Sequence, residues 1–235
     1  MIDASAIGAR LAGVRERVAR AAGRARRDPA TIRLVAVSKT FSADHVRAAA
    51  AAGQIDFGEN KVQEGLQKIA QTADLPLTWH LIGHLQSNKA RKAGEAFNLI
   101  HSIDGAPLIA KLDEAAQAAG RIVQLLVQVD LAGEATKHGA REDELQQMFD
   151  AARTARAARV TGLMTLPPAT DDPEGARPYF RKLRSIRDGL LARGVDASML
   201  TDLSMGMSHD FEVAVEEGST LVRVGSAIFG ERTYV

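Results

Sequence analysis

A lysine stands at the end of an apolar run close to the N-terminus. Lys39 follows the segment LVAVS at residues 34–38, which has the β-branched, apolar character of a buried strand. At such a strand end an amine is partly desolvated, which favours its neutral, nucleophilic form. A neutral amine condenses with an aldehyde to give a Schiff base. From position alone, a lysine that reaches water or pairs with a carboxylate is an equally good interpretation.

Two turns rich in small residues lie near the C-terminus. One precedes a helix expected to begin near residue 209, and the other begins a further helix. Their free backbone N–H groups and the helix dipoles attract a dianion, and small side chains let it approach. Serine capping of two ordinary helices is the alternative. Because both turns follow the last two predicted strands, we favour a phosphate site. Its candidate residues are Ser204, Gly206, Ser208, Gly225 and Ser226.

Three further polar side chains stand at or near predicted strand ends. Asn60 offers a donor and an acceptor, although capping of the following helix is the better interpretation of this residue taken alone. His80 could stack on a planar ligand, or it could be a satisfied core histidine. Arg223 lies two residues before Gly225 and therefore shares its strand face.

The elements that must position these residues alternate regularly along the chain. Eight apolar segments with strand character are separated by Ala-, Leu- and charge-rich segments with helical spacing. Nearly continuous apolar strands indicate parallel pairing with both faces covered, and eight such strands close a barrel. We therefore predict an α/β fold, a single (β/α)8 TIM barrel, with an open doubly wound sheet as the alternative. The expected strands are residues 32–39, 55–59, 78–83, 99–103, 122–129, 160–166, 200–204 and 221–225.

The first 27 residues predict an extra amphipathic helix, because Ile7, Leu11, Val14 and Val18 recur at spacings of three and four. We expect this helix to pack on the barrel and cover its bottom. No linker divides the chain, so residues 1–235 are expected to form one domain.

Composition excludes several classes of function. The 30 basic and 29 acidic residues leave a net charge of +1, which argues against a nucleic-acid binder. The chain has no cysteine, so disulfides and thiolate metal sites are excluded. No apolar run is long enough to span a membrane. We expect a cytoplasmic protein without a metal.

A lysine and a phosphate site at the same end of one barrel suggest a phosphorylated aldehyde. Pyridoxal 5′-phosphate (PLP) fits, with its phosphate in the two turns and its aldehyde at Lys39. Arg223 would then face the pyridine nitrogen and keep it unprotonated, since a second positive charge nearby is unfavourable. Such a ring is a weaker electron sink.

Six ordered blocks of the sequence resemble the YggS/PROSC family of PLP homeostasis proteins. The blocks are LVAVSKT, FGENKVQE, WHLIGHLQSNK, HSID, GLMTLPP and LSMGMSHDFEVAVEEGSTLVRVGSAIFG. The resemblance extends from about residue 7 to residue 230. It implies a PLP fold-type III barrel, like the N-terminal domain of alanine racemase. It also implies an intracellular carrier or regulator of PLP without established catalysis.

Residue by residue, the resemblance assigns a cofactor site. Lys39 holds PLP as a Schiff base, Asn60 and His80 line the pocket, and Met164 contacts the cofactor. Arg223 lies near the ring nitrogen. The phosphate residues are those of the two turns, namely Ser204, Gly206, Ser208, Gly225 and Ser226.

The chain also departs from the family pattern in places. Ser226 stands where threonine is frequent, and His84 stands where proline is frequent. A further matching block contains Glu134, Lys137 and Gly139, whose role the resemblance does not assign.

An amino-acid racemase of the alanine racemase type is the enzymatic alternative. It needs a second base, which alanine racemase supplies as a tyrosine from a C-terminal domain, and neither Tyr179 nor Tyr234 is a good candidate. A phosphosugar aldolase also pairs a barrel lysine with a phosphate site, but usually places the lysine on a later strand. We therefore expect a non-catalytic PLP carrier that is a monomer or a weak dimer. Its recipients would be PLP-dependent apoenzymes, and it would bind neither nucleic acid nor membrane.

Overall fold

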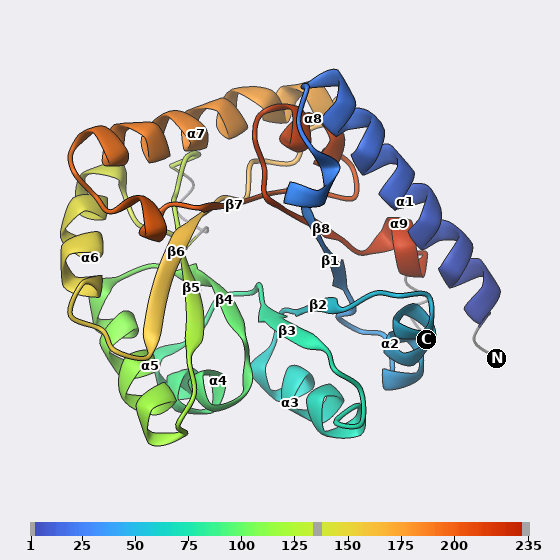
Figure 1. Cartoon of the computed structure of the whole chain (residues 1–235), viewed down its shortest axis with the longest axis horizontal. Helices are drawn as coiled ribbons and strands as arrows, with labels where there is room; N and C mark the ends of the chain where they lie inside the picture. Colours follow the sequence, from blue (N-terminus) through green and yellow to red (C-terminus); the bar gives the residue numbers. More distant parts are fainter. Residues whose placement is uncertain (1–2, 134–137, 232–235) are drawn as a thin grey trace.

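Eight parallel strands close into a barrel in the order of the chain (Figure 1). The computed structural model describes residues 3–133 and 138–231. Each strand pairs with the next, and β8 pairs with β1 in the register Val35 to Arg223. The barrel prediction is confirmed and the open sheet is wrong. The strands are β1 (Arg33–Val37), β2 (Asp56–Glu59), β3 (Thr78–Leu81), β4 (Leu99–Ile103), β5 (Val123–Gln128), β6 (Ala158–Met164), β7 (Asp202–Met207) and β8 (Leu221–Val224).

Helices surround the barrel, because each crossover between parallel strands returns over the outer face (Figure 1). The α-helices are α1 (Ala4–Arg24), α2 (Ala43–Ala51), α3 (Val62–Gln71), α4 (Ala90–Ala96), α5 (Ala106–Ala118), α6 (Leu145–Ala152), α7 (Arg177–Ala192), α8 (Phe211–Glu216) and α9 (Ser226–Phe229). Short 3-10 helices are η1 (Pro29–Thr31), η2 (Ser87–Lys89), η3 (Glu142–Glu144), η4 (Pro173–Ala176) and η5 (Ala197–Met199). Among the described residues, no helix is both long and apolar enough to cross a bilayer.

The N-terminal helix α1 packs in the outer layer, against α2, α8 and α9 (Figure 1). Its apolar stripe is buried as predicted. Arg17 and Arg24 pair with Glu212 on α8, with closest N–O distances of 2.7 and 3.0 Å. The expectation that this helix covers the bottom of the barrel is wrong. The helix instead packs against α2, α8 and α9, the helices that flank β8 and β1.

The interior of the barrel holds a small apolar cluster, separate from the larger core beneath the helices. It consists of Val35, Leu99, Leu126, Met164 and Leu221. These residues occupy inward positions of five strands, where alternate side chains point into the barrel. Polar inward positions lie above and below this apolar layer, and they form the site described below.

Two predicted boundaries near the C-terminus are wrong. Strand β7 continues to Met207, so Gly206 lies inside a strand rather than in a turn. The following helix begins at Phe211, not near His209. The reason is local: Asp210 accepts a hydrogen bond from the Met207 N–H at 2.6 Å and closes a turn before the helix starts.

Gly162 on β6 is required by close strand packing. A Cβ there would lie 1.9 Å from the backbone oxygen of Asp202 on β7. We predict that Gly162→Ala lowers the free energy of unfolding by at least about 1–3 kcal/mol, the usual cost of overpacking. Gly13→Ala is the matched control. A Cβ at Gly13 would meet nothing within 4 Å, and in the middle of α1 it should stabilise by about 0.5–1 kcal/mol. Urea unfolding measures both, and equal effects would contradict the packing argument.

Candidate functional site

A cavity of about 930 Å³ opens at the carboxyl ends of the strands. In a parallel barrel this is the end at which chemistry is performed. Six of the predicted site residues line it together: Lys39, Asn60, Ser208, Arg223, Gly225 and Ser226. The fold therefore brings residues from the first two strand ends next to residues from the last two.

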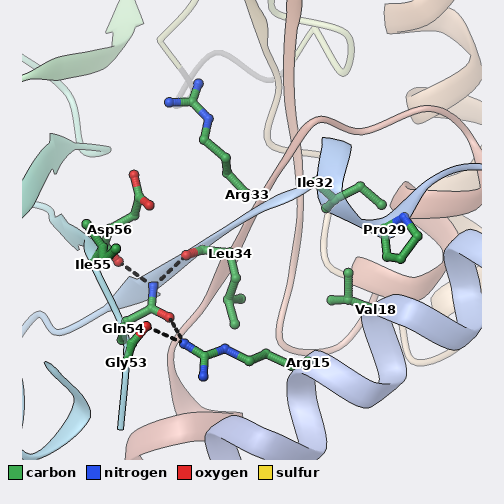
Figure 2. A pocket seen from close by; sticks show the side chains of 10 residues that line it. All are labelled: Arg15, Val18, Pro29, Ile32, Arg33, Leu34, Gly53, Gln54, Ile55 and Asp56. Carbon is green, nitrogen blue, oxygen red and sulfur yellow. Dashed lines mark hydrogen bonds between the residues drawn. The ribbon is translucent and has the colours of Figure 1, made fainter. Parts of the chain in front are cut away.

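A second cavity, of about 360 Å³, lies at the opposite end of β1 and β2, against α1 (Figure 2). Its polar groups are already bonded to one another. Arg15 donates to the Gly53 carbonyl at 2.7 Å and to Gln54 Oε1 at 3.3 Å. Gln54 in turn donates to the carbonyls of Leu34 and Asp56. These contacts tie α1 to the barrel, so this cavity serves as a structural junction.

Lys39 stands in a turn held in an unusual conformation. Thr40, the next residue, has φ +71°, which costs a side-chain-bearing residue about 1–2 kcal/mol. The Thr40 N–H donates to Glu64 Oε1 at 2.6 Å, and the Ser38 N–H donates to the Gly58 carbonyl at 3.0 Å. Both bonds fix the backbone on either side of Lys39.

Behind this turn lies a buried ionic network centred on Lys68 of α3. Lys68 Nζ donates to the Ser38 carbonyl at 2.7 Å, to Glu59 Oε1 at 2.7 Å and to Glu64 Oε1 at 2.8 Å. Glu59 Oε1 also accepts from the Ser38 hydroxyl at 2.5 Å. Glu59 is fully buried and Lys68 nearly so. The network thus joins β1, β2 and α3 directly beneath Lys39.

Burial dominates the electrostatics of this network. It raises the pKa of Glu59, and the hydrogen bonds from Lys68 and Ser38 oppose that rise only in part. At Glu64 burial also acts to raise the pKa, but bonds from Lys68 and the Thr40 N–H outweigh it and the pKa falls. Glu59, Glu64 and Lys68 were not among the site residues predicted from the sequence. The available signal was the i, i+4 spacing of Glu64 and Lys68 on one face of a helix.

Arg223 brings a positive charge to the cavity from β8. Its guanidinium is buried and donates to Ser204 Oγ at 2.5 Å and to the Thr165 carbonyl at 2.9 Å. Burial lowers the pKa of Arg223 to about 10, so it is protonated at neutral pH. The strand register holds Arg223 two residues below Gly225, on the same side of the barrel wall.

A chain of buried hydrogen bonds continues from Arg223 down the barrel. Ser204 Oγ lies 2.8 Å from His101 Nδ1, and His101 Nε2 lies 3.0 Å from His80 Nδ1. His80 Nε2 lies 2.8 Å from Asp56 Oδ1 at the amino end of β2. Burial lowers the pKa of both histidines, so both are neutral at neutral pH.

The two ends of this chain fix the direction of every proton in it. A guanidinium only donates and a carboxylate only accepts. Therefore His80 donates from Nε2 to Asp56, and His101 donates from Nε2 to His80. The remaining nitrogen, His101 Nδ1, accepts from Ser204. The chain holds the Arg223 guanidinium rigidly from below.

Four predicted site residues lie behind the cavity wall. His80 and Ser204 belong to the buried chain, and Met164 belongs to the apolar cluster inside the barrel. Gly206 has φ +95°, and a Cβ there would lie 2.5 Å from the Cβ of Ala214. Direct contact of these four with a ligand stays a prediction.

The structure also describes Asn60 and Gly139, two further positions singled out from the sequence. Asn60 does not cap α3, whose N-cap is Lys61 without a side-chain bond. Gly139 has φ +152°, and a Cβ there would lie 2.8 Å from the Asp130 nitrogen. Glu134, Lys137 and Tyr234 lie outside the described residues.

The two small-residue turns are joined by one hydroxyl. Ser208 Oγ, after β7, accepts from the Gly225 N–H at 3.0 Å and from the Ala227 N–H at 3.5 Å. A Cβ at Gly225 would lie 3.2 Å from the Val37 carbonyl, so the second turn lies close against β1. Backbone N–H groups, two serine hydroxyls and a guanidinium thus share one cavity with the Lys39 amine.

Comparison with known proteins gives consistent results. The family model for the N-terminal domain of alanine racemase matches residues 9–233. The pyridoxal phosphate homeostasis protein of Aquifex aeolicus is 43% identical, over 96% of this chain and 98% of its own. Its counterpart in Escherichia coli K12 is 38% identical, over 95% and 96%. This chain belongs to the family of pyridoxal phosphate homeostasis proteins.

The fold of this chain is also similar to those of solved structures. PipY of Synechococcus elongatus, solved with and without PLP, has a TM-score of 0.85 and 40% identity over 95% of this chain and 100% of its own. Alanine racemase of Corynebacterium glutamicum has a TM-score of 0.74 at 18% identity, which shows a shared fold. This homeostasis-family chain covers 63% of that racemase. The predicted family and fold are confirmed.

The buried ion pair generates a stability prediction. Lys68→Met leaves the Glu59 carboxylate buried without its cation, and we expect the free energy of unfolding to fall by about 3–5 kcal/mol. Adding Glu59→Gln should restore part of this loss, because the uncompensated charge is then gone. Urea unfolding of the four variants of this double-mutant cycle measures the coupling. Arg47→Met, at the exposed pair with Asp74, is the control and should have a much smaller effect. Additive effects of Lys68→Met and Glu59→Gln would contradict the network.

The histidine chain generates a pH prediction. His80 and His101 have lowered pKa values in the folded protein, whereas the unfolded chain binds their protons near pH 6.5. Stability is therefore fully present above about pH 6.5 and is lost as the pH falls below it. The slope is up to about 1.4 kcal/mol per pH unit for each histidine.

Urea unfolding between pH 8 and pH 5 checks this slope. His101→Asn removes one titrating group and should flatten the dependence relative to the unmodified chain. His209→Ala, at an exposed histidine between β7 and α8, is the control for loss of a histidine elsewhere. An unchanged slope in His101→Asn would show that the buried chain is not the source.

Proposed function

We propose that this chain binds PLP in the cavity at the carboxyl ends of the strands and acts as a carrier or regulator of PLP rather than as an enzyme. The observation that carries the proposal is that Lys39, Arg223 and the two joined turns line one cavity. PLP presents an aldehyde, a pyridine nitrogen and a phosphate, and each has a chemically suitable partner there. The structure of PipY with PLP bound, at 40% identity, supports the same cofactor.

Lys39 is the residue proposed to bond covalently to PLP. Its Nζ would attack the aldehyde carbon and release water. Bound PLP supplies an electrophilic carbon and a ring that withdraws electrons. The Lys68 network fixes the Ser38 carbonyl and the Thr40 N–H, so the amine enters the cavity from a held backbone. Preorganisation of this kind reduces the entropy lost on bond formation.

The two joined turns are proposed to hold the phosphate. Ser208, Gly225 and Ser226 line the cavity, and the Gly225 and Ala227 N–H groups converge on the Ser208 hydroxyl. A dianion seated there would compete with that hydroxyl for the same N–H donors. A Cβ at Gly225 would lie 3.2 Å from the Val37 carbonyl oxygen, so glycine lets this turn pack closely against β1.

Arg223 is proposed to face the pyridine nitrogen. Its guanidinium stays protonated at neutral pH, and the Ser204–His101–His80–Asp56 chain holds it in place. A fixed positive charge disfavours protonation of the ring nitrogen. The ring is then a weaker electron sink, so the site need not be a versatile catalyst.

The carrier role draws further support from the curated relatives, which are named homeostasis proteins. Racemisation needs a base on each face of the substrate carbon. Tyr179 lies on α7 and does not line the cavity. Transfer of PLP to apoenzymes, a monomeric or weakly dimeric state and a cytoplasmic location stay predictions from the sequence.

The proposal is tested by reducing the holo-protein with borohydride. The purified chain, incubated with PLP, should be yellow, and borohydride should remove the colour and leave a pyridoxyl group on the Lys39 peptide. Lys39→Ala should lose the covalent adduct, whereas Lys111→Ala, at an exposed site on α5, should retain it. Chiral analysis of amino acids incubated with the same preparation should show no interconversion.

Two results would overturn the proposal in different ways. A chain that stays colourless in excess PLP, or an adduct on another lysine, would contradict the cofactor site. Racemisation at ordinary enzyme rates, above about 1 s⁻¹, would contradict the carrier role while leaving the site intact.

A further inference from the structure

We infer that His84, Asp104 and His138 form a binding site for a divalent transition metal of the Zn²⁺ class at the rim of the cavity. The sequence predicted no metal, but the absence of cysteine excludes only thiolate ligands and not imidazoles or carboxylates. The three side chains come from three successive loops, after β3, β4 and β5. Both histidines line the large cavity, so the site adjoins the proposed cofactor pocket without sharing a residue proposed to bind PLP.

The candidate ligand atoms of the three side chains lie close together. One nitrogen of each histidine and one oxygen of Asp104 all lie within 4.8 Å of one another. His84 Nδ1 and Asp104 Oδ2 are 3.6 Å apart. In a tetrahedral zinc site, bonds of about 2.0–2.2 Å place neighbouring ligand atoms about 3.3–3.6 Å apart. The His84–Asp104 pair already has this spacing, and rotation of the two histidine side chains would complete the site around a metal ion.

The two imidazole rings lie against each other. Their centroids are 3.5 Å apart and their planes differ by 11°. Such close stacking of two half-exposed histidines would be repulsive if both were charged. An imidazole binds a metal along the in-plane lone pair of its nitrogen, so the two rings must turn apart from this stacked arrangement for both to bind one ion. Both rings must also be unprotonated at the binding nitrogen.

The backbone beneath the histidines is fixed by the barrel. The Ser102 hydroxyl on β4 donates to the Gly83 carbonyl at 2.7 Å, immediately before His84. Gln128 Nε2 at the end of β5 donates to the His138 carbonyl. Side chains of the barrel strands thus hold the backbone at both positions, which reduces the backbone entropy lost when a metal binds.

The donor set selects the kind of metal. Two imidazoles and one carboxylate suit Zn²⁺ and its neighbours, whereas Mg²⁺ and Ca²⁺ prefer all-oxygen sites. Three protein ligands leave one position for water or an anion, the arrangement of an open zinc site. A bound ion would also join the loops after β3, β4 and β5 along one side of the cavity mouth.

Metal titration of the full chain, stripped with a chelator and free of PLP, tests this inference. We expect one Zn²⁺ per chain by calorimetry, and Co²⁺ should give the intense visible bands of a four-coordinate site. His84→Ala, His138→Ala and Asp104→Asn should each weaken Zn²⁺ binding by more than about 10-fold, since even outer-shell partners contribute that much. His45→Ala, a histidine outside the cluster, should bind as the unmodified chain does.

The affinity should also fall between pH 7.5 and pH 5.5, because protons compete for both imidazoles. Circular dichroism confirms that each variant is folded before it is titrated. Failure of Zn²⁺ to bind at micromolar concentration would overturn the inference, as would binding that survives all three substitutions. Because PLP is absent throughout, either result leaves the proposed cofactor site untouched.

Discussion

Hydrogen bonding between β8 and β1 is the constraint on which the rest of the structure depends. It joins the two ends of the chain and sets Val35 beside Arg223. As a result Lys39, which follows β1, stands opposite the turn that begins at Gly225, nearly two hundred residues later. A sheet left open between β8 and β1 would separate the amine from the phosphate-binding turns and leave no shared cavity.

Buried charge on both sides of the cavity is held by neighbouring side chains. On one side Lys68 bridges two glutamates and the Ser38 carbonyl beneath Lys39. On the other, Arg223 ends a chain of four hydrogen-bonded side chains that descends to Asp56. An unpaired charge in either place would cost several kcal/mol, so these networks place the reactive groups and oppose alternative packings. The loops at the rim are secured less extensively, by Ser102 and Gln128, and it is there that the candidate metal ligands meet.

Much of the site was predictable because strand ends are marked in the sequence. Lys39, Arg223 and the small-residue turns were found from the rule that a parallel barrel works at the carboxyl ends of its strands. The Lys68 network was missed because a lysine on a helix is normally a solvated residue, and only its burial reveals another role. His80 was predicted to contact a planar ligand, and Ser204 was predicted to belong to a phosphate-binding turn. Their depth along the barrel depends on strand tilt and register, which a single sequence does not encode locally.

The order of strands and helices, the closed barrel and the end at which chemistry lies all follow from local sequence patterns. Periodicity and a count of eight strands are sufficient for these. The contacts between side chains emerge with the complete fold: α1 lies beside α8 rather than beneath the barrel, and His84 stacks on His138 across two loops. Contacts between residues distant in the chain depend on the three-dimensional path of every intervening element. Side-chain type at each position restricts such contacts but does not specify them.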